Sequence, residues 1–346
     1  MRFTVTVQPS GRQFDADDEQ TLLESALQQS VVLPYGCKTG ACGSCKSRVV
    51  SGEVEQGPHA ASALRPEEAA GGHVLLCCAY PKSDLAIEAR VVMAGDIQIR
   101  KMPCRIASLQ RVAPDVIIVK LQLPANETLR YLAGQYLEFV LRDGTRRSYS
   151  MAGAPQQAQQ IELHIRHLPG GRFTDALFGV ATPPVKERDV LRFEGPMGTF
   201  FLREDSDKPI ILLASGTGFA PIKAIVEHAI DKSITRPMTL YWGGRRPQDL
   251  YLHALAEQWA AELPHFDYRP VVSDARPEDA WTGRTGFVHQ AVVDEHPDLS
   301  GHQVYACGAP IVVDSARRDF VARCGLPDDE FYADSFTSAA DTVKLA

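Results

Sequence analysis

The 346-residue sequence contains no apolar run that approaches the roughly 18 residues needed to cross a membrane. Its first ten residues alternate polar and apolar side chains, which indicates a strand and not a secretory signal. Internal repeats and low-complexity tracts are also lacking. With 45% hydrophobic and 23% charged residues, the composition excludes a disordered, collagen-like or coiled-coil chain. We therefore expect a cytoplasmic protein of two or three domains with no membrane partner.

The sequence also lacks an excess of positive charge, because its formal net charge is −7. A nucleic-acid partner needs a basic face for phosphate contacts, so we expect none. Residues 93–205 are the exception, with 15 Lys and Arg against 12 Asp and Glu. This basic stretch is either a solvated face or a place where an anionic ligand binds.

The residue pattern divides the chain into three domains and a linker. Residues 1–92 combine an alternating strand at 2–7 and a helix at 21–29 with a Gly- and Cys-rich loop, which resembles a β-grasp unit. Residues 93–102 carry little pattern and are predicted to be the linker. Residues 103–205 hold short strands separated by Gly, Pro and Asn, as in an antiparallel β-barrel. Residues 206–346 repeat a strand–turn–helix unit and predict an α/β domain with a parallel sheet. The further predicted strands are 74–76, 85–92, 115–123, 136–141, 161–166, 190–193, 210–214, 239–242 and 304–307.

Four of the eight cysteines follow one spacing. Cys37, Cys42 and Cys45 form C-x4-C-x2-C, and Cys77 follows with 31 residues between. This is the spacing of plant-type [2Fe–2S] ferredoxins, and the small intervening residues would let three thiolates of one loop converge on two irons. A zinc site is the alternative, because C-x-x-C pairs also ligate zinc. The x4 spacing and the neighbouring glycines favour the iron–sulfur cluster.

The fourth ligand is Cys77 or the adjacent Cys78. The stretch Leu75-Leu76-Cys77-Cys78-Ala79-Tyr80-Pro81 resembles the ferredoxin-domain pattern L-x-C followed by a polar residue, which favours Cys77. We therefore predict Cys37, Cys42, Cys45 and Cys77 as the ligands and Cys78 as a buried neighbour.

A flavin-binding pattern lies in the middle segment. Arg147-Ser148-Tyr149-Ser150 matches R-x-Y-S, in which Arg pairs with a pyrophosphate, Tyr stacks on the isoalloxazine and a hydroxyl bonds near its N5. So short a pattern also arises by chance in a surface strand. Two further motifs follow in order, however: Gly170-Gly171-Arg172-Phe173-Thr174 after the strand E-L-H-I-R, and Gly195-Pro196-Met197-Gly198-Thr199-Phe200, which is predicted to be a turn that closes the barrel.

The last segment carries a nucleotide-binding pattern. Gly216-Thr217-Gly218-Phe219-Ala220-Pro221 follows an apolar strand and opens a helix, where glycines let the chain approach a pyrophosphate. Tyr241-Trp242-Gly243-Gly244-Arg245-Arg246 ends the next strand, where an adenosine ribose would lie. Cys307-Gly308-Ala309-Pro310 ends a later strand; Cys307 either contacts the nicotinamide or merely packs the sheet. The aromatic tail up to Phe336 either lies near the flavin or caps the sheet.

Together these motifs resemble the ferredoxin–NADP reductase superfamily with an N-terminal plant-type ferredoxin domain, and most closely the CDP-6-deoxy-Δ3,4-glucoseen reductase family. The resemblance spans essentially the whole chain and implies an oxidoreductase that passes electrons from NADH through FAD and a [2Fe–2S] cluster to a partner protein. It implies the catalytic side chains Cys307, Tyr149 and Ser150. It also implies cofactor contacts from Arg147, Ser148, Tyr149, Ser150, His164, Arg166, Gly171, Arg172, Phe173, Thr174, Gly216, Thr217, Gly218, Pro221, Arg245, Arg246, Cys307, Gly308 and Phe336.

Three alternatives stay open at this point. The acceptor implied by the resemblance is a sugar dehydrase, but reductase components of oxygenases share every redox motif. A non-catalytic redox module or sensor would retain the same folds. NADH is the expected donor, since the loop 243–251 resembles G-x-R-x-x-x-D-L-Y of NADH-using relatives, yet Arg245 and Arg246 could meet the 2′-phosphate of NADPH.

Overall fold

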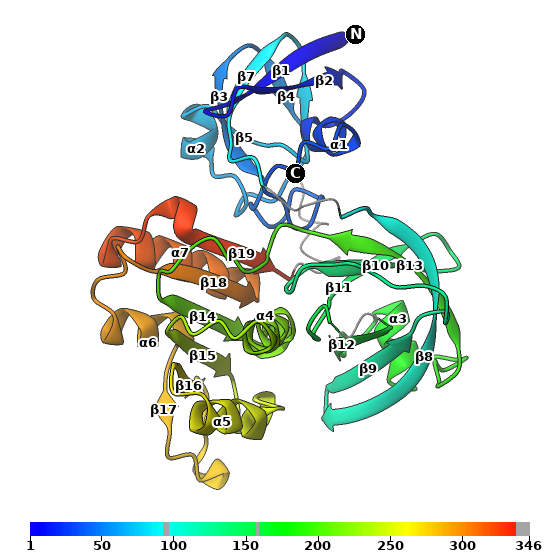
Figure 1. Ribbon diagram of the computed structural model, residues 1–346, viewed down its shortest axis with the longest axis vertical. Coiled ribbons are helices and arrows are strands. Elements are labelled where there is room, and N and C mark those ends of the chain that lie inside the picture. The colour runs from blue at the N-terminus through cyan, green and yellow to red at the C-terminus, as the bar shows by residue number, and fades with distance from the viewer. Residues whose placement is uncertain (93–96, 157–158, 337–346) are drawn as a thin grey trace. The chain divides into compact units, whose positions relative to one another are not determined.

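The computed structural model describes residues 1–92, 97–156 and 159–336 (Figure 1). The chain divides into two compact units, one built on Met1–Asp96 together with the residues from Asp334 onward, and one on Ile97–Ala333. In the described part of the chain, no helix is long and apolar enough to cross a membrane.

The N-terminal unit is a mixed sheet with two short helices packed against it. Its five-stranded sheet has the order β2-β1-β7-β3-β5, in which β1 and β7 run parallel and β1 and β2 antiparallel. Helix α1 (Leu22–Gln28) buries Leu22, Leu23 and Ala26, and a capping box of Thr21 and Glu24 fixes its start. The remaining elements are β1 (Arg2–Gln8), β2 (Arg12–Asp17), β3 (Lys46–Ser51), β4 (Val54–Gln56), α2 (Pro66–Ala70), β5 (His73–Leu75), β6 (Ala79–Pro81) and β7 (Leu85–Glu88). This arrangement is the predicted β-grasp.

The middle segment forms an antiparallel barrel. Its six strands have the order β11-β10-β13-β8-β9-β12, and a bridge between Met151 and Leu163 brings the two outer strands together. The core inside is apolar and includes Phe139, Leu163 and Phe193. The elements are β8 (Arg100–Ala113), β9 (Val116–Gln122), β10 (Tyr136–Val140), β11 (Arg146–Ser150), β12 (Gln160–Arg166), α3 (Arg172–Leu177) and β13 (Val190–Met197).

The last segment is a parallel sheet between two layers of helices. Its strands have the order β17-β16-β15-β14-β18-β19, and β14, the first of them in the chain, lies inside the sheet between β15 and β18. Helices α4 and α5 cover one face and α6 and α7 the other (Figure 1). Its elements are β14 (Ile210–Ser215), α4 (Phe219–Asp231), β15 (Met238–Gly244), α5 (His253–Glu262), β16 (Phe266–Val272), β17 (Arg284–Thr285), α6 (Val288–Glu295), β18 (Gln303–Gly308), α7 (Pro310–Cys324) and β19 (Phe331–Ser335).

Some predicted boundaries are wrong. Part of the predicted linker, residues 93–96, lies outside the described residues, but Arg100–Met102 already belongs to β8, which the sequence analysis did not anticipate. The strand predicted at 85–92 ends at Glu88. The predicted turn at Gly195–Phe200 begins later, because Gly195–Met197 continues β13 and pairs with β10 and β8.

Candidate cofactor sites

The four predicted cluster cysteines converge in the N-terminal unit. Cys37, Cys42 and Cys45 lie in the loop between α1 and β3, and Cys77 lies just after β5. The cysteines form two pairs: Cys45 Sγ lies 3.3 Å from Cys77 Sγ, and Cys42, whose thiol is hydrogen-bonded to that of Cys37, also accepts the Cys37 N–H at 3.3 Å. The described residues contain no group of three or more His, Cys, Asp or Glu side chains arranged to hold a metal ion. Two pairs are the arrangement that two irons require, one pair to each.

Backbone N–H groups of this loop point at the sulfurs. Thr39 and Ala41 each donate to Cys37 Sγ at 3.4 Å, and Gly40 donates to Cys77 Sγ at 3.3 Å. The thiol of Cys42, assisted by those donors and opposed by burial, lowers the pKa of Cys37 to about 5. Donors of this kind stabilise thiolate charge, so the loop fits an anionic iron–sulfur cluster.

Glycine is required at one point of this loop. Gly40 has φ of +72°, and a Cβ there would lie 2.7 Å from Cys78 Sγ and 3.1 Å from the Cβ of His59. A side chain would therefore both strain the backbone and push on the cysteine next to the fourth predicted ligand. Cys78 Sγ itself lies 3.6 Å from Cys77 Sγ. It is Cys77 that faces Cys45 and receives the Gly40 N–H, which supports Cys77 as the ligand.

The two flavin motifs meet inside the barrel. Tyr149 on β11 and Phe173 on α3 have ring centroids 5.8 Å apart, and both rings also lie against Phe139. Burial raises the pKa of Tyr149. Ser150 at the end of β11 is buried as well. Thus residues predicted from motifs more than 20 positions apart come together in space.

The other flavin-motif side chains have protein partners. The Arg147 guanidinium donates to the Arg146 carbonyl at 2.7 Å, and Ser148 Oγ donates to a Glu138 carboxylate at 3.3 Å. Arg172 pairs with Asp143. Their predicted contacts with FAD stay predictions.

The Gly170–Thr174 loop is closed by bonds of its own. Thr174 Oγ1 donates to the Leu168 carbonyl at 2.9 Å, and the Gly170 N–H donates to an Asp175 carboxylate at 3.1 Å. A Cβ on Gly171 would lie 2.6 Å from Thr174 Oγ1, so the loop has room only for glycine there. A phosphate at this loop would replace some of these bonds.

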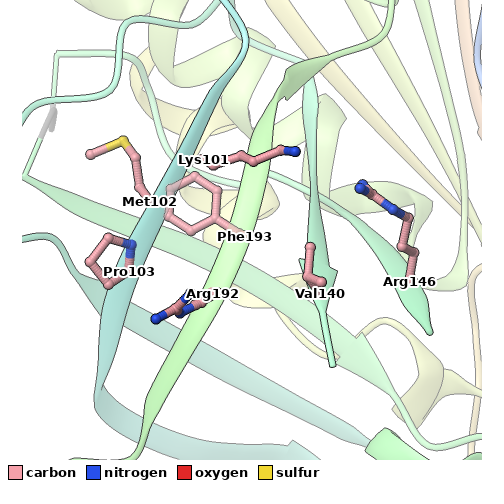
Figure 2. Close-up of a pocket in the computed structure, with 7 residues that line it drawn as sticks. All are labelled: Lys101, Met102, Pro103, Val140, Arg146, Arg192 and Phe193. Atoms are coloured by element: carbon pink, nitrogen blue, oxygen red, sulfur yellow. The ribbon is translucent and has the colours of Figure 1, made fainter. Parts of the chain in front are cut away.

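A pocket of about 270 Å³ lies elsewhere on the barrel, lined by Lys101, Met102, Pro103, Val140, Arg146, Arg192 and Phe193 (Figure 2). Arg146 in this pocket is bound by Glu138 and Glu194, each at 2.8 Å. Successive side chains of a strand point to opposite faces, so the pocket and Arg147 lie on different faces of β11. The two glutamates partly neutralise the positive charge of this pocket. None of the predicted cofactor residues lines it.

The two glycine-rich turns of the nucleotide domain pack against each other. A Cβ on Gly218 would lie 2.1 Å from the Cys307 carbonyl oxygen. Gly308 has φ of +138°, and a Cβ there would lie 2.6 Å from the Ser215 carbonyl oxygen. Only glycine fits at both positions, and the sheet thereby places Gly216–Gly218 beside Cys307 and Gly308, while their predicted contacts with the nucleotide stay predictions.

Two stacked aromatic rings pack against the Gly216–Gly218 turn. Phe219 stacks on Trp242 with centroids 3.9 Å apart and planes 8° apart, and the Trp242 indole N–H donates to the Gly216 carbonyl at 3.0 Å. Pro221 is buried in the first turn of α4. Cys307 is fully buried in β18, which is compatible with either of its predicted roles.

Two predicted residues on β12 have well-defined surroundings. A Cβ on Gly216 would lie 2.6 Å from Nη1 of Arg166, so this guanidinium lies against the nucleotide turn. His164 is fully enclosed, with Nε2 3.0 Å from Glu162 and Nδ1 2.8 Å from the Tyr251 hydroxyl. Direct contact of its ring nitrogens with FAD would require one of these bonds to break.

The two arginines after β15 differ. Arg246 binds Asp279 through Nε at 2.7 Å and Nη2 at 2.6 Å, and also lies 3.4 Å from Glu278. The Arg245 guanidinium forms no ion pair among the described residues. Phe336 directly follows β19 and is half-buried; its predicted place near the flavin stays a prediction.

Sequence reasoning missed Glu162, Lys223 and Tyr251. Glu162 stands two positions before His164 and so shares its face of β12, and Lys223 is a single cation in the otherwise apolar start of α4. Tyr251 ends the loop motif 243–251, which gives no sign of its contact with His164. The single charge of Lys223 among apolar neighbours is the available signal, but its partner Glu162 on β12 lies 61 positions away in the chain.

Comparison with known proteins agrees with this three-part arrangement. Residues 5–82 match the 2Fe-2S iron-sulfur cluster binding domain, residues 103–202 the oxidoreductase FAD-binding domain, and residues 212–318 the oxidoreductase NAD-binding domain. The protein is therefore an iron–sulfur flavoprotein oxidoreductase that uses a [2Fe–2S] cluster, FAD and a nicotinamide nucleotide.

Relatives share the whole arrangement. The chain is 41% identical over 97% of its length to CDP-6-deoxy-L-threo-D-glycero-4-hexulose-3-dehydrase reductase of Yersinia pseudotuberculosis serotype I (strain IP32953), covering 99% of that protein. It is 36% identical to reductase component 2 of terephthalate 1,2-dioxygenase from Comamonas sp, with 98% of each chain covered. Among solved structures, the Amycolatopsis cytochrome P450 reductase GcoB matches with a TM-score of 0.75 at 34% identity, over 97% of this chain and 99% of that one. The chain belongs to this family of electron-transfer reductases.

Proposed function

We propose that this protein takes electrons from NADH and delivers them singly to a separate acceptor protein, most specifically the dehydrase of a CDP-6-deoxyhexulose system in the cytoplasm. FAD, held by the barrel, would supply the change from two-electron to one-electron transfer that is needed between a nicotinamide and a [2Fe–2S] cluster, which takes one electron at a time. Two local features support the two ends of that route, each within its own unit: the Gly218–Gly308 contact shapes the nucleotide turn, and the N–H groups that donate to Cys37 and Cys77 would stabilise the charge of a cluster.

The similarity to a hexulose-dehydrase reductase over nearly the full length of both chains supports this acceptor. The similarity to a dioxygenase reductase component supports the second candidate, an oxygenase component. Turnover with NADH and each purified acceptor decides between them. We expect a pyridoxamine-phosphate-dependent sugar dehydrase to be reduced. If an oxygenase component is reduced and the dehydrase is not, the first candidate is contradicted. A redox sensor would reduce neither these proteins nor ferricyanide.

The pairing of Arg246 supports NADH as the donor. Its guanidinium is bound on two nitrogens by Asp279, so it is already neutralised and poorly placed to bind a 2′-phosphate. Only Arg245 is then left for that charge. We expect kcat/KM to be about tenfold or more higher for NADH than for NADPH, measured with ferricyanide as acceptor. A clear preference for NADPH would contradict this choice of donor.

A further inference from the structure

A buried polar network joins the flavin barrel to the nucleotide domain at strand β12. Glu162 and His164 come from β12, whereas Lys223 lies on α4 and Tyr251 follows β15. Within the unit Ile97–Ala333, Lys223 Nζ lies 3.1 Å from a Glu162 oxygen, and the Tyr251 hydroxyl lies 2.8 Å from His164 Nδ1. We call Glu162, His164, Lys223 and Tyr251 the interdomain network. It crosses between the two domains twice, through Glu162–Lys223 and through His164–Tyr251, and both crossings start from the same face of β12.

The protonation of each member follows from its partners. Burial lowers the pKa of His164, which is therefore neutral. Burial alone would raise the pKa of Glu162, but the hydrogen bond from His164 and the charge of Lys223 outweigh it and lower that pKa to about 2. An ionised Glu162 only accepts, so His164 Nε2–H donates to it at 3.0 Å. His164 Nδ1 is then the acceptor, and the Tyr251 hydroxyl donates.

Lys223 has an acceptor for each of its three protons. Besides Glu162, its ammonium lies 2.6 Å from Glu227 and donates to the Ala152 carbonyl at 3.2 Å. Ala152 stands two residues after Ser150, the end of the flavin motif, and its N–H donates to the Glu162 carbonyl at 2.8 Å. Both polar groups of the Ala152 backbone are thus bound by members of the interdomain network, which ties the segment after β11 to β12 and α4.

On the nucleotide side, Tyr251 is packed against the base of the Gly216–Gly218 turn. Its ring lies edge-on to Trp242 at 5.3 Å and to Phe219 at 6.2 Å. Trp242 in turn binds the Gly216 carbonyl, and Phe219 begins α4 directly after the turn. Movement of the Tyr251 hydroxyl relative to His164 would therefore displace the Gly216–Gly218 turn relative to β12.

We propose that Tyr251 and His164 are positioning residues for hydride transfer: their hydrogen bond fixes the nucleotide turn against β12, and thereby the approach of nicotinamide to flavin. Neither side chain needs to touch a reacting atom. Misplacement of reacting groups by about 1 Å costs up to roughly 100-fold in rate, so the loss of one buried bond across this interface has a measurable effect. Buried charged networks contribute little net stability, which leaves geometry as their main contribution here.

The test is flavin reduction by NADH in anaerobic stopped flow, with the full-length holoprotein. We expect Tyr251→Phe, which removes only the hydroxyl, to lower the limiting rate roughly tenfold and to leave the Kd for NADH within about twofold. The long-wavelength charge-transfer absorption of nicotinamide in contact with flavin should weaken in parallel. FAD content and thermal midpoint should stay near wild type.

A matched control lies in the same domain. The Tyr268 hydroxyl binds His253 Nδ1 at 2.9 Å, the same pair chemistry within the nucleotide domain alone, so Tyr268→Phe should keep the wild-type limiting rate. His164→Asn retains an acceptor near the position of Nδ1 and should keep more of the rate than His164→Leu.

The inference rests on the proposed route from NADH to FAD, and wild-type protein that fails to bleach its flavin with NADH would overturn that route itself. A wild-type limiting rate in Tyr251→Phe would overturn the positioning role alone. So would a variant that loses FAD while its flavin-loaded fraction reacts at the wild-type rate, because the bond would then be merely structural. An equal loss in Tyr268→Phe would also contradict it.

Discussion

Cys77 and Cys78 occupy adjacent positions but different surroundings. Cys77 faces Cys45 across 3.3 Å and accepts the Gly40 N–H, whereas Cys78 lies beside Gly40 and contacts Cys77 at 3.6 Å. We expect cluster assembly to depend on the sulfur that pairs with Cys45, and these contacts favour Cys77.

Replacement of each cysteine by serine tests this assignment. We expect Cys77→Ser to bleach the visible iron–sulfur absorption or shift the EPR signal of the reduced cluster, because an alkoxide is a poorer ligand for these irons than a thiolate. Cys78→Ser should leave both spectra intact. The reverse pair of results would show that Cys78 is the fourth ligand.

The two possible roles of Cys307, guiding the nicotinamide and packing the sheet, predict opposite effects of its replacement on rate and stability. If its thiol guides the nicotinamide, Cys307→Ala should slow flavin reduction by NADH about tenfold or more, roughly 1.4 kcal/mol at the transition state, with FAD content and thermal midpoint nearly unchanged. If the thiol only fills the sheet, the midpoint falls and the rate stays. Cys104, a buried thiol in the barrel core, is the matched control: Cys104→Ala should show the packing behaviour alone. An unchanged bleaching rate would remove Cys307 from the catalytic residues.

At the scale of elements, apolar strands and glycine-rich turns were predictable because their signals are local. β14 is apolar throughout, and the Gly216–Gly218 turn follows it as expected. β8 was missed because Pro103 and several charged residues interrupt its apolar pattern. In the structure Pro103 is exposed while Met102, Cys104 and Ile106 alternate into the core, so the strand survives with its proline on the outer face.

The candidate site was predictable to the same extent. Spacing predicted Cys37, Cys42 and Cys45 and left Cys77 or Cys78 as the fourth ligand, for which the resemblance to L-x-C favoured Cys77. The motifs predicted Tyr149 and Phe173, which the structure places in contact. The bond between His164 and Tyr251 was beyond sequence reasoning, since it joins residues 87 positions apart in two domains. Likewise, two adjacent arginines look equivalent in a sequence, and only the fold shows that Asp279 binds Arg246.

At the scale of the whole molecule, the three domains divide the electron route into its nicotinamide, flavin and cluster parts. The barrel and the nucleotide domain belong to one compact unit, Ile97–Ala333, which contains the flavin and nucleotide motifs. The cluster cysteines belong to the other unit. We expect reduction of a small acceptor such as ferricyanide to need only the unit Ile97–Ala333, and reduction of a protein acceptor to need the cluster as well.

Separation of the two activities tests this division of labour. We expect Cys42→Ser in the full-length chain, which removes a cluster ligand, to keep NADH–ferricyanide activity within about twofold and to lower cytochrome c reduction by roughly tenfold or more, because flavin alone supports only the first reaction well. Removal of residues 1–92 should give the same result. That truncation also takes away neighbours of Asp334, which belongs to the same compact unit, so the full-length variant is the cleaner measurement. If both activities were lost while FAD content fell, flavin binding would depend on the N-terminal unit; if cytochrome c reduction survived in both variants, electrons would leave directly from the flavin and the cluster would not be the exit.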